Sequence, residues 1–432
     1  MFNTIVNAFK IKEVRKKILI TILLIFIYRI GCFIPVPGVT MFTGLEEYSF
    51  LQIMSAVSGG ALQFGTFFAM GIGPYINASI IIQLLTVGIP ALVRLSKQGE
   101  EGRKRINAYT RMLTLVLAII QAIGILVAFS GGENSGIDTG ALFGTQGFAK
   151  IASYIFLVIV YTAGASLTMW IGERITDYGV SNGISLLIFV GILSTAGNAI
   201  LGVIREMGNP ATAQTATWTL IGFVLAAIVI FAAIVAVNSA ERKIPVQYAK
   251  QVKGRKMYGG QSTHIPIKIN ASGVMPLIFA YAILSFPDLI LNLLGKSNTW
   301  WSNNMGTGTV PYTIVLCVLI LFFSYFYNMM QFNPDDISKS IQGNGGFIPG
   351  TRPGKPTADY LKRISNRITL FGAIFLALMA LVPSLVFKFV GGEGLVNVFS
   401  ATGLLIVVSV ALEFEQALQS QIMMKNYKGF LK

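Results

Sequence analysis

Ten apolar stretches, each long enough for one helix to cross a bilayer, alternate with polar gaps along this chain. A helix needs about 20 predominantly apolar residues to cross the hydrocarbon core. The sequence therefore predicts an all-α polytopic membrane protein with ten transmembrane helices. The predicted spans are residues 18–37, 72–92, 112–130, 151–171, 184–204, 217–238, 274–294, 311–331, 369–389 and 395–412.

Positive charge lies almost entirely in alternate gaps between these spans. Cytoplasmic loops of membrane proteins carry an excess of Lys and Arg. We therefore expect both termini and the strongly basic gaps to be cytoplasmic, and we interpret most of the net charge of +15 as this topology signal. Of the 33 Lys and Arg residues, 28 fall in segments 1–17, 93–111, 172–183, 239–272, 332–368 and 413–432.

The predicted spans contain few ionisable side chains. Arg29 lies toward the outer end of the first span, where a long side chain can snorkel to the interface. Ion-coupled transporters usually carry charge at membrane depth. His264, the only histidine, falls in a predicted loop, so the spans lack His-based metal sites and Ser–His or Cys–His pairs. We expect no metal, no cofactor and no enzymatic activity, with a secondary transporter as the competing class.

Short internal matches indicate a repeat. Residues 71–78 at the second span align with 273–280 at the seventh, and 186–190 in the fifth align with 404–408 in the tenth. Both matches pair a span with the span five positions later, and an odd offset gives the two halves opposite orientations. Such inverted repeats place the working site between the halves near the midplane. The predicted organisation is an N-terminal cytoplasmic segment, two five-helix halves and a C-terminal tail, at residues 1–17, 18–204, 205–412 and 413–432.

Two predicted cytoplasmic loops, 239–272 and 332–368, are longer than simple connections require. In the first, apolar residues alternate with polar ones around Val246 and again around Ile267, which predicts paired strands with a basic tip. In the second, Pro and Gly residues frame a basic pair. Rigid basic protrusions suit docking to ribosomal RNA or a soluble motor protein, whereas excess positive-inside charge is the simpler alternative. The docking candidates are Lys250, Lys253, Arg255, Lys256, Arg352 and Lys355.

The segment from Ser58 to Met70 is too short to span a membrane and is followed by Gly71-Ile-Gly-Pro74. One interpretation is a surface helix on the outer leaflet. The other is a re-entrant half-helix, which is tolerated at membrane depth only when buried in protein or lining a water-filled cavity. The second interpretation implies a pore.

Several long motifs resemble the SecY family of bacterial protein-conducting channels, and the resemblance covers essentially the whole chain. It implies that unfolded secretory chains cross the bacterial cytoplasmic membrane here and that apolar segments leave sideways into the lipid bilayer. The implied partners are the SecE and SecG subunits, the SecA motor ATPase, the ribosome and substrate chains with signal sequences. The motifs are RIGCFIPVPG (29–38), SGGAL followed by GIGPYINASIIIQLL (58–85), KQGEEGRKRINAYTR (97–111), QSTHIPIKIN (261–270) and FIPGTRPGKPT (347–357).

In that family a ring of aliphatic side chains forms the narrowest point of the channel. The residue pattern agrees with this assignment, because two pairs of ring candidates are spaced i,i+4 on one helix face. An apolar constriction blocks ions by dewetting and offers a passing chain no hydrogen bonds. The alternative is that these are ordinary packed isoleucines. Carried over by motif, the ring consists of Ile72, Ile76, Ile184, Ile188, Ile278 and Ile406.

The resemblance also implies a plug and a lateral gate. The plug is the segment at about 58–70, with Ser58, Gly59, Gly60, Ala61, Leu62, Phe64 and Phe67 as its residues. Sideways exit requires two helices to part, and the repeat nominates the second and seventh spans, which Gly and Pro interrupt at corresponding positions. We assign Asn77, Gln83, Phe286 and Asn328 to this gate.

Overall fold

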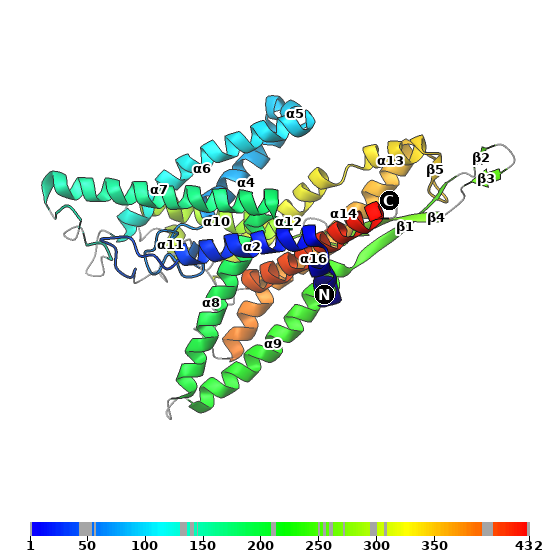
Figure 1. Cartoon of the computed structure of the whole chain (residues 1–432). Coiled ribbons are helices and arrows are strands. Elements are labelled where there is room, and N and C mark those ends of the chain that lie inside the picture. The colour runs from blue at the N-terminus through cyan, green and yellow to red at the C-terminus, as the bar shows by residue number, and fades with distance from the viewer. Residues whose placement is uncertain are drawn as a thin grey trace.

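Long helices dominate the computed structural model of this 432-residue chain (Figure 1). All ten predicted spans correspond to a long helix, so this part of the prediction is confirmed. The structure describes residues 2–42, 54–55, 58–129, 136–138, 142–144, 146–208, 213–248, 251–253, 256–258, 262–270, 273–293, 300–305, 309–390 and 401–429.

The first half contributes five of the long helices and the second half the other five. Helices α2, α4, α6, α7 and α8 cover Lys12–Gly31, Gly73–Gly88, Gly99–Phe129, Gly147–Tyr178 and Gly183–Met207. Helices α9, α10, α12, α14 and α16 cover Ala213–Ser239, Met275–Leu293, Val310–Gln331, Lys355–Val390 and Ala401–Gly429. The short helices α1, α5, α11 and α13 cover Phe2–Lys10, Pro90–Ser96, Trp300–Asn304 and Pro334–Gly343.

Helix α4 stops sooner than the second predicted span, and α5 continues from it at an angle of 103°. The break lies at Ile89, whose backbone is extended (φ −99°, ψ 115°). Proline disfavours the helical conformation of the residue before it, so Pro90 accounts for the bend. By length and composition, seven helices of the described residues can span a membrane, and the bent pair α4–α5 is an eighth candidate.

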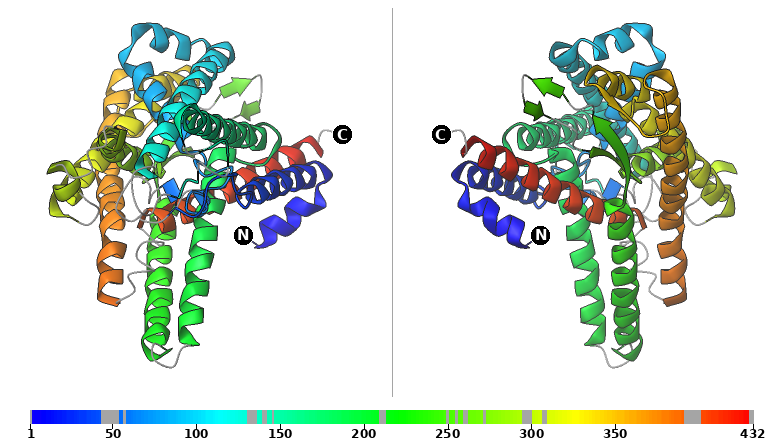
Figure 2. Two further views of the ribbon diagram at one scale, coloured as in Figure 1. Left: turned by 90° about the vertical axis from the view of Figure 1, so that its left-hand side faces the viewer. Right: turned by 90° about the vertical axis from the view of Figure 1, so that its right-hand side faces the viewer.

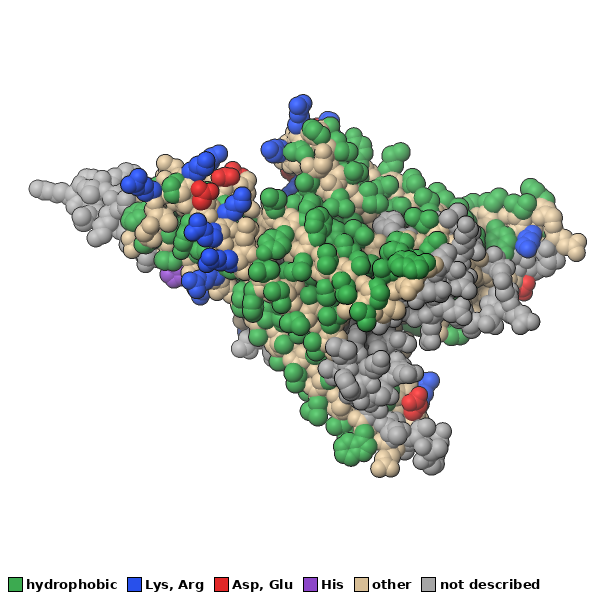
Figure 3. Space-filling model, turned by 180° about the vertical axis from the view of Figure 1, so that it is seen from behind, with side chains coloured by type: hydrophobic (Ala, Val, Ile, Leu, Met, Phe, Trp, Pro, Cys, Tyr) green, Lys and Arg blue, Asp and Glu red, His purple; other side chains and the backbone are tan. Residues whose placement is uncertain are grey.

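Large apolar side chains remain exposed along several of these helices. On α2 they include Leu19, Leu23 and Phe26, and on α9 they include Leu225 and Val229. Exposed apolar surface of this extent marks a contact with lipid or another apolar partner. The space-filling view shows apolar side chains over the middle of the molecule, while Lys and Arg gather at the end that carries the two long loops (Figure 3).

The two halves meet along several helix pairs. Helix α8 of the first half packs against α9 and α16 of the second, and α6 packs against α10. The views along the horizontal axis of Figure 1 show these helices surrounding the centre of the molecule (Figure 2). The main apolar core joins both halves and includes Ile72 and Ile188 from the first half and Ile406 from the second. The centre of the molecule is therefore built by both halves.

The two long loops fold together into one small unit, here called the platform (residues 241–270 and 334–361 as far as described). The predicted strands are confirmed, because β1 (Glu241–Tyr248) pairs antiparallel with β4 (Ser262–Lys268) and places Ile244 opposite Ile265. Strand β5 (Gly346–Phe347) of the second loop then pairs with the other edge of β1. Two short strands, β2 (Gln251–Lys253) and β3 (Lys256–Tyr258), extend the first loop as a hairpin.

Candidate functional site

The segment 58–72 lies largely inside the protein, although Phe64 is exposed. Eight of its side chains are almost completely buried: Ser58, Ala61, Leu62, Thr66, Phe68, Ala69, Met70 and Ile72. This burial contradicts the surface-helix interpretation and agrees with a re-entrant segment. Its backbone differs from the expected half-helix, because residues 59–72 form successive turns. Gly59, Gly60, Gly65 and Gly71 have φ between 51° and 84°, a region that glycine adopts without a steric penalty and that interrupts a right-handed helix.

Glycines on the surrounding helices let the segment approach closely. A Cβ atom added at Gly164 of α7 would lie 2.0 Å from the carbonyl oxygen of Phe67, and one added at Gly31 of α2 would lie 2.0 Å from the ring of Phe68. The Phe68 ring also stacks on Tyr28, with centroids 5.5 Å apart. The amide of Phe67 donates to the Ile34 carbonyl at 2.9 Å. The segment is therefore held by backbone and ring contacts, and side chains larger than glycine at positions 31 and 164 would block these contacts.

Arg29 turns toward this segment and does not snorkel to the interface as the sequence suggested. Its Nη2 donates to the Ser194 hydroxyl on α8, and its guanidinium lies 5.5 Å from the centroid of the Phe33 ring. A Cβ atom at Gly59 would lie 2.5 Å from Arg29 Nη1, so the guanidinium packs directly against the start of the segment. Ser194 thus supplies a partner inside the protein for Nη2, while Nη1 is buried without a hydrogen-bond partner among the described residues.

The six predicted ring residues come together in the core shared by both halves. Ile72, Ile188 and Ile406 are buried in it, and Ile76, Ile184 and Ile278 pack against it. A Cβ atom at Gly172 of α7 would lie 3.4 Å from both Ile72 and Ile184, so those two side chains meet over a glycine. The structure thus assembles one apolar cluster from the ends of α4, α8, α10 and α16.

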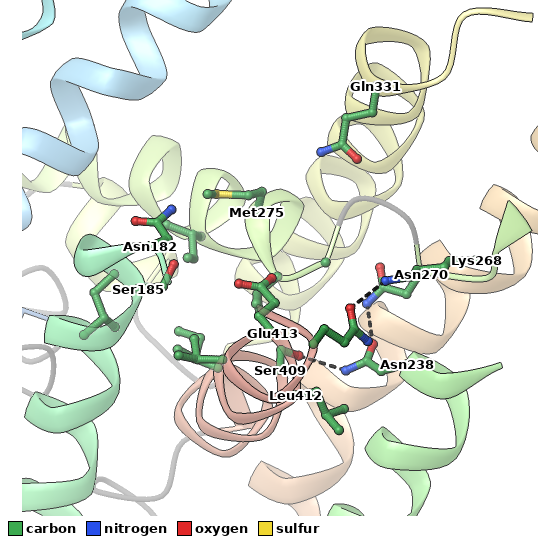
Figure 4. Close-up of a pocket in the computed structure, with 17 residues that line it drawn as sticks. Asn182, Ser185, Asn238, Lys268, Asn270, Met275, Gln331, Ser409, Leu412 and Glu413 are labelled. Carbon is green, nitrogen blue, oxygen red and sulfur yellow. Dashed lines mark hydrogen bonds between the residues drawn. The ribbon is translucent and has the colours of Figure 1, made fainter. Parts of the chain in front are cut away.

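A polar hollow of about 240 Å³ opens above three of these isoleucines, namely Ile188, Ile278 and Ile406. Amide and hydroxyl side chains line its walls, together with one lysine and one glutamate. In Figure 4 the labelled polar residues come from α8 and its N-cap, α9, α12, α16 and the end of β4 with the turn after it, while α10 contributes Met275. The polar lining residues are Asn182, Ser185, Asn238, Lys268, Asn270, Gln331, Ser409, Glu413 and Gln416.

Hydrogen bonds fix one wall of this hollow. Asn270 donates to Asn238 at 2.8 Å, and Asn238 donates to the Ser409 hydroxyl at 2.9 Å. Lys268 Nζ donates to Gln416 Oε1 at 2.8 Å. Sequence reasoning did not select these polar residues, although Asn238 and Ser409 sit next to or inside apolar runs where a polar side chain is a signal of function.

Along the seam between the halves, one hydrogen bond joins a predicted gate residue to the other half. The hydroxyl of Tyr327 on α12 donates to Gln83 Oε1 on α4 at 2.6 Å. Asn328, which the sequence nominated, faces α14, where its Oδ1 accepts from Ser365 at 3.0 Å. Asn77 is buried on α4, and the side chain of Phe286 lies outside the described residues. Tyr327 was missed because a tyrosine in an aromatic run gives no distinguishing pattern.

Of the docking candidates, Arg352 and Lys355 are exposed at the start of α14. Their loop is held firmly, since Thr357 Oγ1 donates to the Arg352 carbonyl at 2.8 Å and Ser338 Oγ donates to the Gly354 carbonyl at 2.7 Å. The backbones of Lys253 and Lys256 pair with each other in the β2–β3 hairpin, but their side chains, and all of Lys250 and Arg255, lie outside the described residues. The two described basic side chains thus occupy a rigid loop on the platform.

Comparison with known proteins gives consistent matches over the length of the chain. The SecY family model matches residues 66–415. The protein translocase subunit SecY of Streptomyces griseus is 43% identical, and that of Mycobacterium tuberculosis is 38% identical, each covering 100% of both chains.

Solved structures share the fold at lower identity. One described as the structure of a protein conducting channel has a TM-score of 0.70 and 20% identity over 94% of this chain and 92% of that chain. Sec61 in the canine ribosome-channel complex from the endoplasmic reticulum has a TM-score of 0.64 and 18% identity with the same coverage.

Proposed function

This chain belongs to the SecY family, and we propose from that premise how its residues conduct a polypeptide. It is a multi-pass membrane protein and a protein translocase subunit that forms a protein-conducting channel. The observation that carries the proposal is the polar hollow whose lining includes Ile188, Ile278 and Ile406, three of the proposed ring residues. The comparisons favour this function over the alternative of a secondary transporter.

The six isoleucines form the seal of the resting channel. A constriction lined only by aliphatic side chains excludes water and so excludes ions. Because it presents no hydrogen-bonding group, it also gives a passing chain nothing to bind, whatever its sequence. The amide and hydroxyl groups of the hollow serve the opposite purpose, since they can hydrogen-bond the peptide groups of an extended chain before it meets the ring.

The segment 58–72 acts as the plug. It sits against α2, α7 and α8, and its last residue, Ile72, is itself a ring member. Its backbone forms turns instead of a regular helix, so the segment can leave without unfolding a helix. Displacement of the plug would expose Arg29 and Ser194 to the passage, and water would then solvate the guanidinium.

The seam between α4 and α6 on one side and α10 and α12 on the other is the lateral gate. The Tyr327–Gln83 bond crosses it and stabilises the closed arrangement by about 1 kcal/mol, the usual net value for a hydrogen bond. Asn77 and Phe286 lie at similar depth on α4 and α10, roughly 8 and 12 Å from the outer ends of the predicted spans at 1.5 Å per residue. Parting of this seam would let an apolar segment reach lipid.

The platform is the docking surface for the partners that feed the channel. Its basic residues and rigid backbone suit an acidic partner, for which we propose the SecA motor and the ribosome, with SecE and SecG as the small companion subunits. The family relationship and the charge distribution support a location in the bacterial cytoplasmic membrane with both termini in the cytoplasm. The chain supplies the path, and its partners supply the energy.

Conductance of the purified complex in a planar bilayer tests the ring. We replace Ile76, Ile188, Ile278 and Ile406 together by Gly and expect a resting ion leak, because the constriction widens and wets. The matched control replaces by Gly four exposed isoleucines that also lie on long helices, namely Ile119, Ile155, Ile204 and Ile228. This control should not leak. An unchanged conductance in the ring variant would overturn the assignment.

A further inference from the structure

A small cavity lies between α12, α14 and the turn that follows β4. It offers about 10 Å³ to the centre of a water molecule, which is close to the space that one buried water needs. A buried water also needs two to four polar partners. The cavity is lined by Ile269, Asn270, Ser324, Asn328, Thr369, Gly372 and Ala373, so polar groups surround it on all three elements.

Among these polar groups, the Ser324 hydroxyl is buried and lacks a hydrogen-bond partner among the described residues. The side chain of Ser324 is only 1% exposed. A buried hydroxyl without a partner is costly. Because Ser324 is a wall of the cavity, a molecule inside it can accept the hydroxyl proton.

Two further residues of the cavity wall, Ile269 and Thr369, carry acceptor oxygens. A Cβ atom at Gly372 would lie 2.7 Å from the Ile269 carbonyl oxygen, so glycine at this position allows the turn to approach α14 and brings that carbonyl to the cavity. Thr369 Oγ1 donates to the Ser365 carbonyl at 2.9 Å, which leaves its lone pairs available to accept. One water can therefore accept from Ser324 and donate to these two oxygens.

The cavity also separates two hydrogen-bonded clusters. The gate cluster consists of Gln83, Tyr327, Asn328 and Ser365 and runs from α4 through α12 to α14. Asn328 is its member at the cavity.

The funnel cluster consists of Asn270, Asn238 and Ser409 and runs from the turn through α9 to α16. Asn270 is its member at the cavity, and Ser409 lies three residues after the ring residue Ile406. One cluster thus crosses the gate, and the other ends one helical turn from the ring.

We propose that one water molecule bound in this cavity by Ser324 joins the gate cluster to the funnel cluster and couples the lateral gate to the ring. The coupling rests on the proposed role of the Tyr327–Gln83 bond, whereas the water site does not. Parting of α12 from α4 breaks that bond and shifts α12. The shift carries Ser324 with α12 and strains the water's contact to the Ile269 carbonyl. The neighbouring Asn270 then passes the displacement through Asn238 to Ser409.

Thermal unfolding of the purified complex tests the water site, because the direction in which one substitution shifts the unfolding midpoint depends on whether the cavity holds water. In a hydrated cavity, Ser324→Ala removes a hydrogen-bond partner of the water, and we expect the unfolding midpoint to fall by about 1–2 °C. In a dry cavity, the same change removes an unpaired buried hydroxyl and leaves the midpoint unchanged or higher. Ser166→Ala is the control, because Ser166 Oγ bonds only the Thr162 carbonyl of its own helix, at 2.7 Å.

A density map of the complex that resolves ordered waters gives a second, independent reading. Density within hydrogen-bonding distance of Ser324 Oγ is the expected result. An empty cavity, or a Ser324→Ala midpoint no lower than that of Ser166→Ala, overturns the water site.

A double-mutant cycle tests the coupling, because only coupling energies establish a pathway. Tyr327→Phe and Ser409→Ala are combined, and secretion of a precursor with a weakened signal sequence is measured. We expect the double variant to depart about threefold from the product of the single effects, and this departure to vanish when Ser324→Ala is added. Multiplicative effects in all backgrounds overturn the coupling. If Tyr327→Phe alone changes nothing, the gate assignment fails, and the water site is still decided by the midpoint and the density.

Discussion

Substitution of Gly164 by alanine should displace the plug and make the resting channel leak. The added Cβ would lie 2.0 Å from the Phe67 carbonyl oxygen, whereas real Cβ contacts essentially never fall below 3.0 Å. The oxygen must therefore retreat by about 1 Å, and the 2.9 Å bond from the Phe67 amide to Ile34 is lost or lengthened. Overpacking of this kind costs about 1–3 kcal/mol.

That cost falls on the closed state, because only there does Phe67 touch α7. A change of 1–3 kcal/mol shifts an equilibrium by about 5- to 150-fold, so the displaced plug becomes far more populated. Planar-bilayer conductance of the complex should rise, and a precursor with a weakened signal sequence should be secreted more readily. The matched control is Gly197→Ala on α8, where an added Cβ meets nothing within 4 Å.

The control shares the gain of about 0.5–1 kcal/mol that alanine brings to a helix, so any difference between the two variants comes from the contact with Phe67. Equal conductance of the two variants in intact complexes would refute the reasoning. If Gly164→Ala does not assemble, Gly31→Ala takes its place, because its Cβ meets the Phe68 ring, a side chain that can move more easily than backbone.

Three further predictions concern the platform and the gate. Arg352→Glu should weaken binding of the motor or ribosome and impair transport while the complex assembles normally, since the residue is exposed and the reversed charge would repel an acidic partner. Unchanged binding and transport would mean that this positive charge serves only to set the membrane topology. Val246→Ala, at a fully buried position, should destabilise the platform by about 1–3 kcal/mol, seen as faster protease cleavage of loop 239–272. Tyr327→Phe removes the 2.6 Å bond to Gln83, so the open gate should gain about fivefold in population, and secretion of a weak-signal precursor should increase; a decrease would contradict a closed-state role.

Local pattern in the sequence was sufficient for the spans and the strands. Crossing a bilayer depends on the length and hydropathy of one continuous segment, and a helix of 16 or more residues overlaps each of the ten predicted spans. The β1–β4 pairing followed from the alternation around Val246 and Ile267, since successive side chains of a strand face opposite sides. The resemblance nominated the six ring isoleucines, and the structure places all six in or against one large apolar core shared by both halves. Their role as a ring stays a prediction.

The plug shows where local pattern was insufficient. Its length and glycines indicated a special segment, but turns replaced the expected half-helix because four of its glycines adopt positive φ values. The segment as a whole packs against α2, α7 and α8. Whether a glycine takes that conformation depends on what surrounds it. The inward turn of Arg29 has the same origin, since Ser194 lies 165 residues away in the sequence and becomes its partner only in the packed bundle.

The remaining features depend on which distant elements become neighbours. The sequence predicted strands in the first long loop, but it could not show that β5 of the second loop completes the sheet, because two residues carry no periodicity. Tyr327 meets Gln83 across 244 positions, and Ser324, Asn270 and Thr369 share a cavity only because α12, α14 and the turn after β4 pack together. The sequence by itself determined which segments enter the membrane, since that depends on the transfer of each segment into lipid. Helix packing decided which polar groups meet there, because side-chain contacts depend on the relative positions of whole helices.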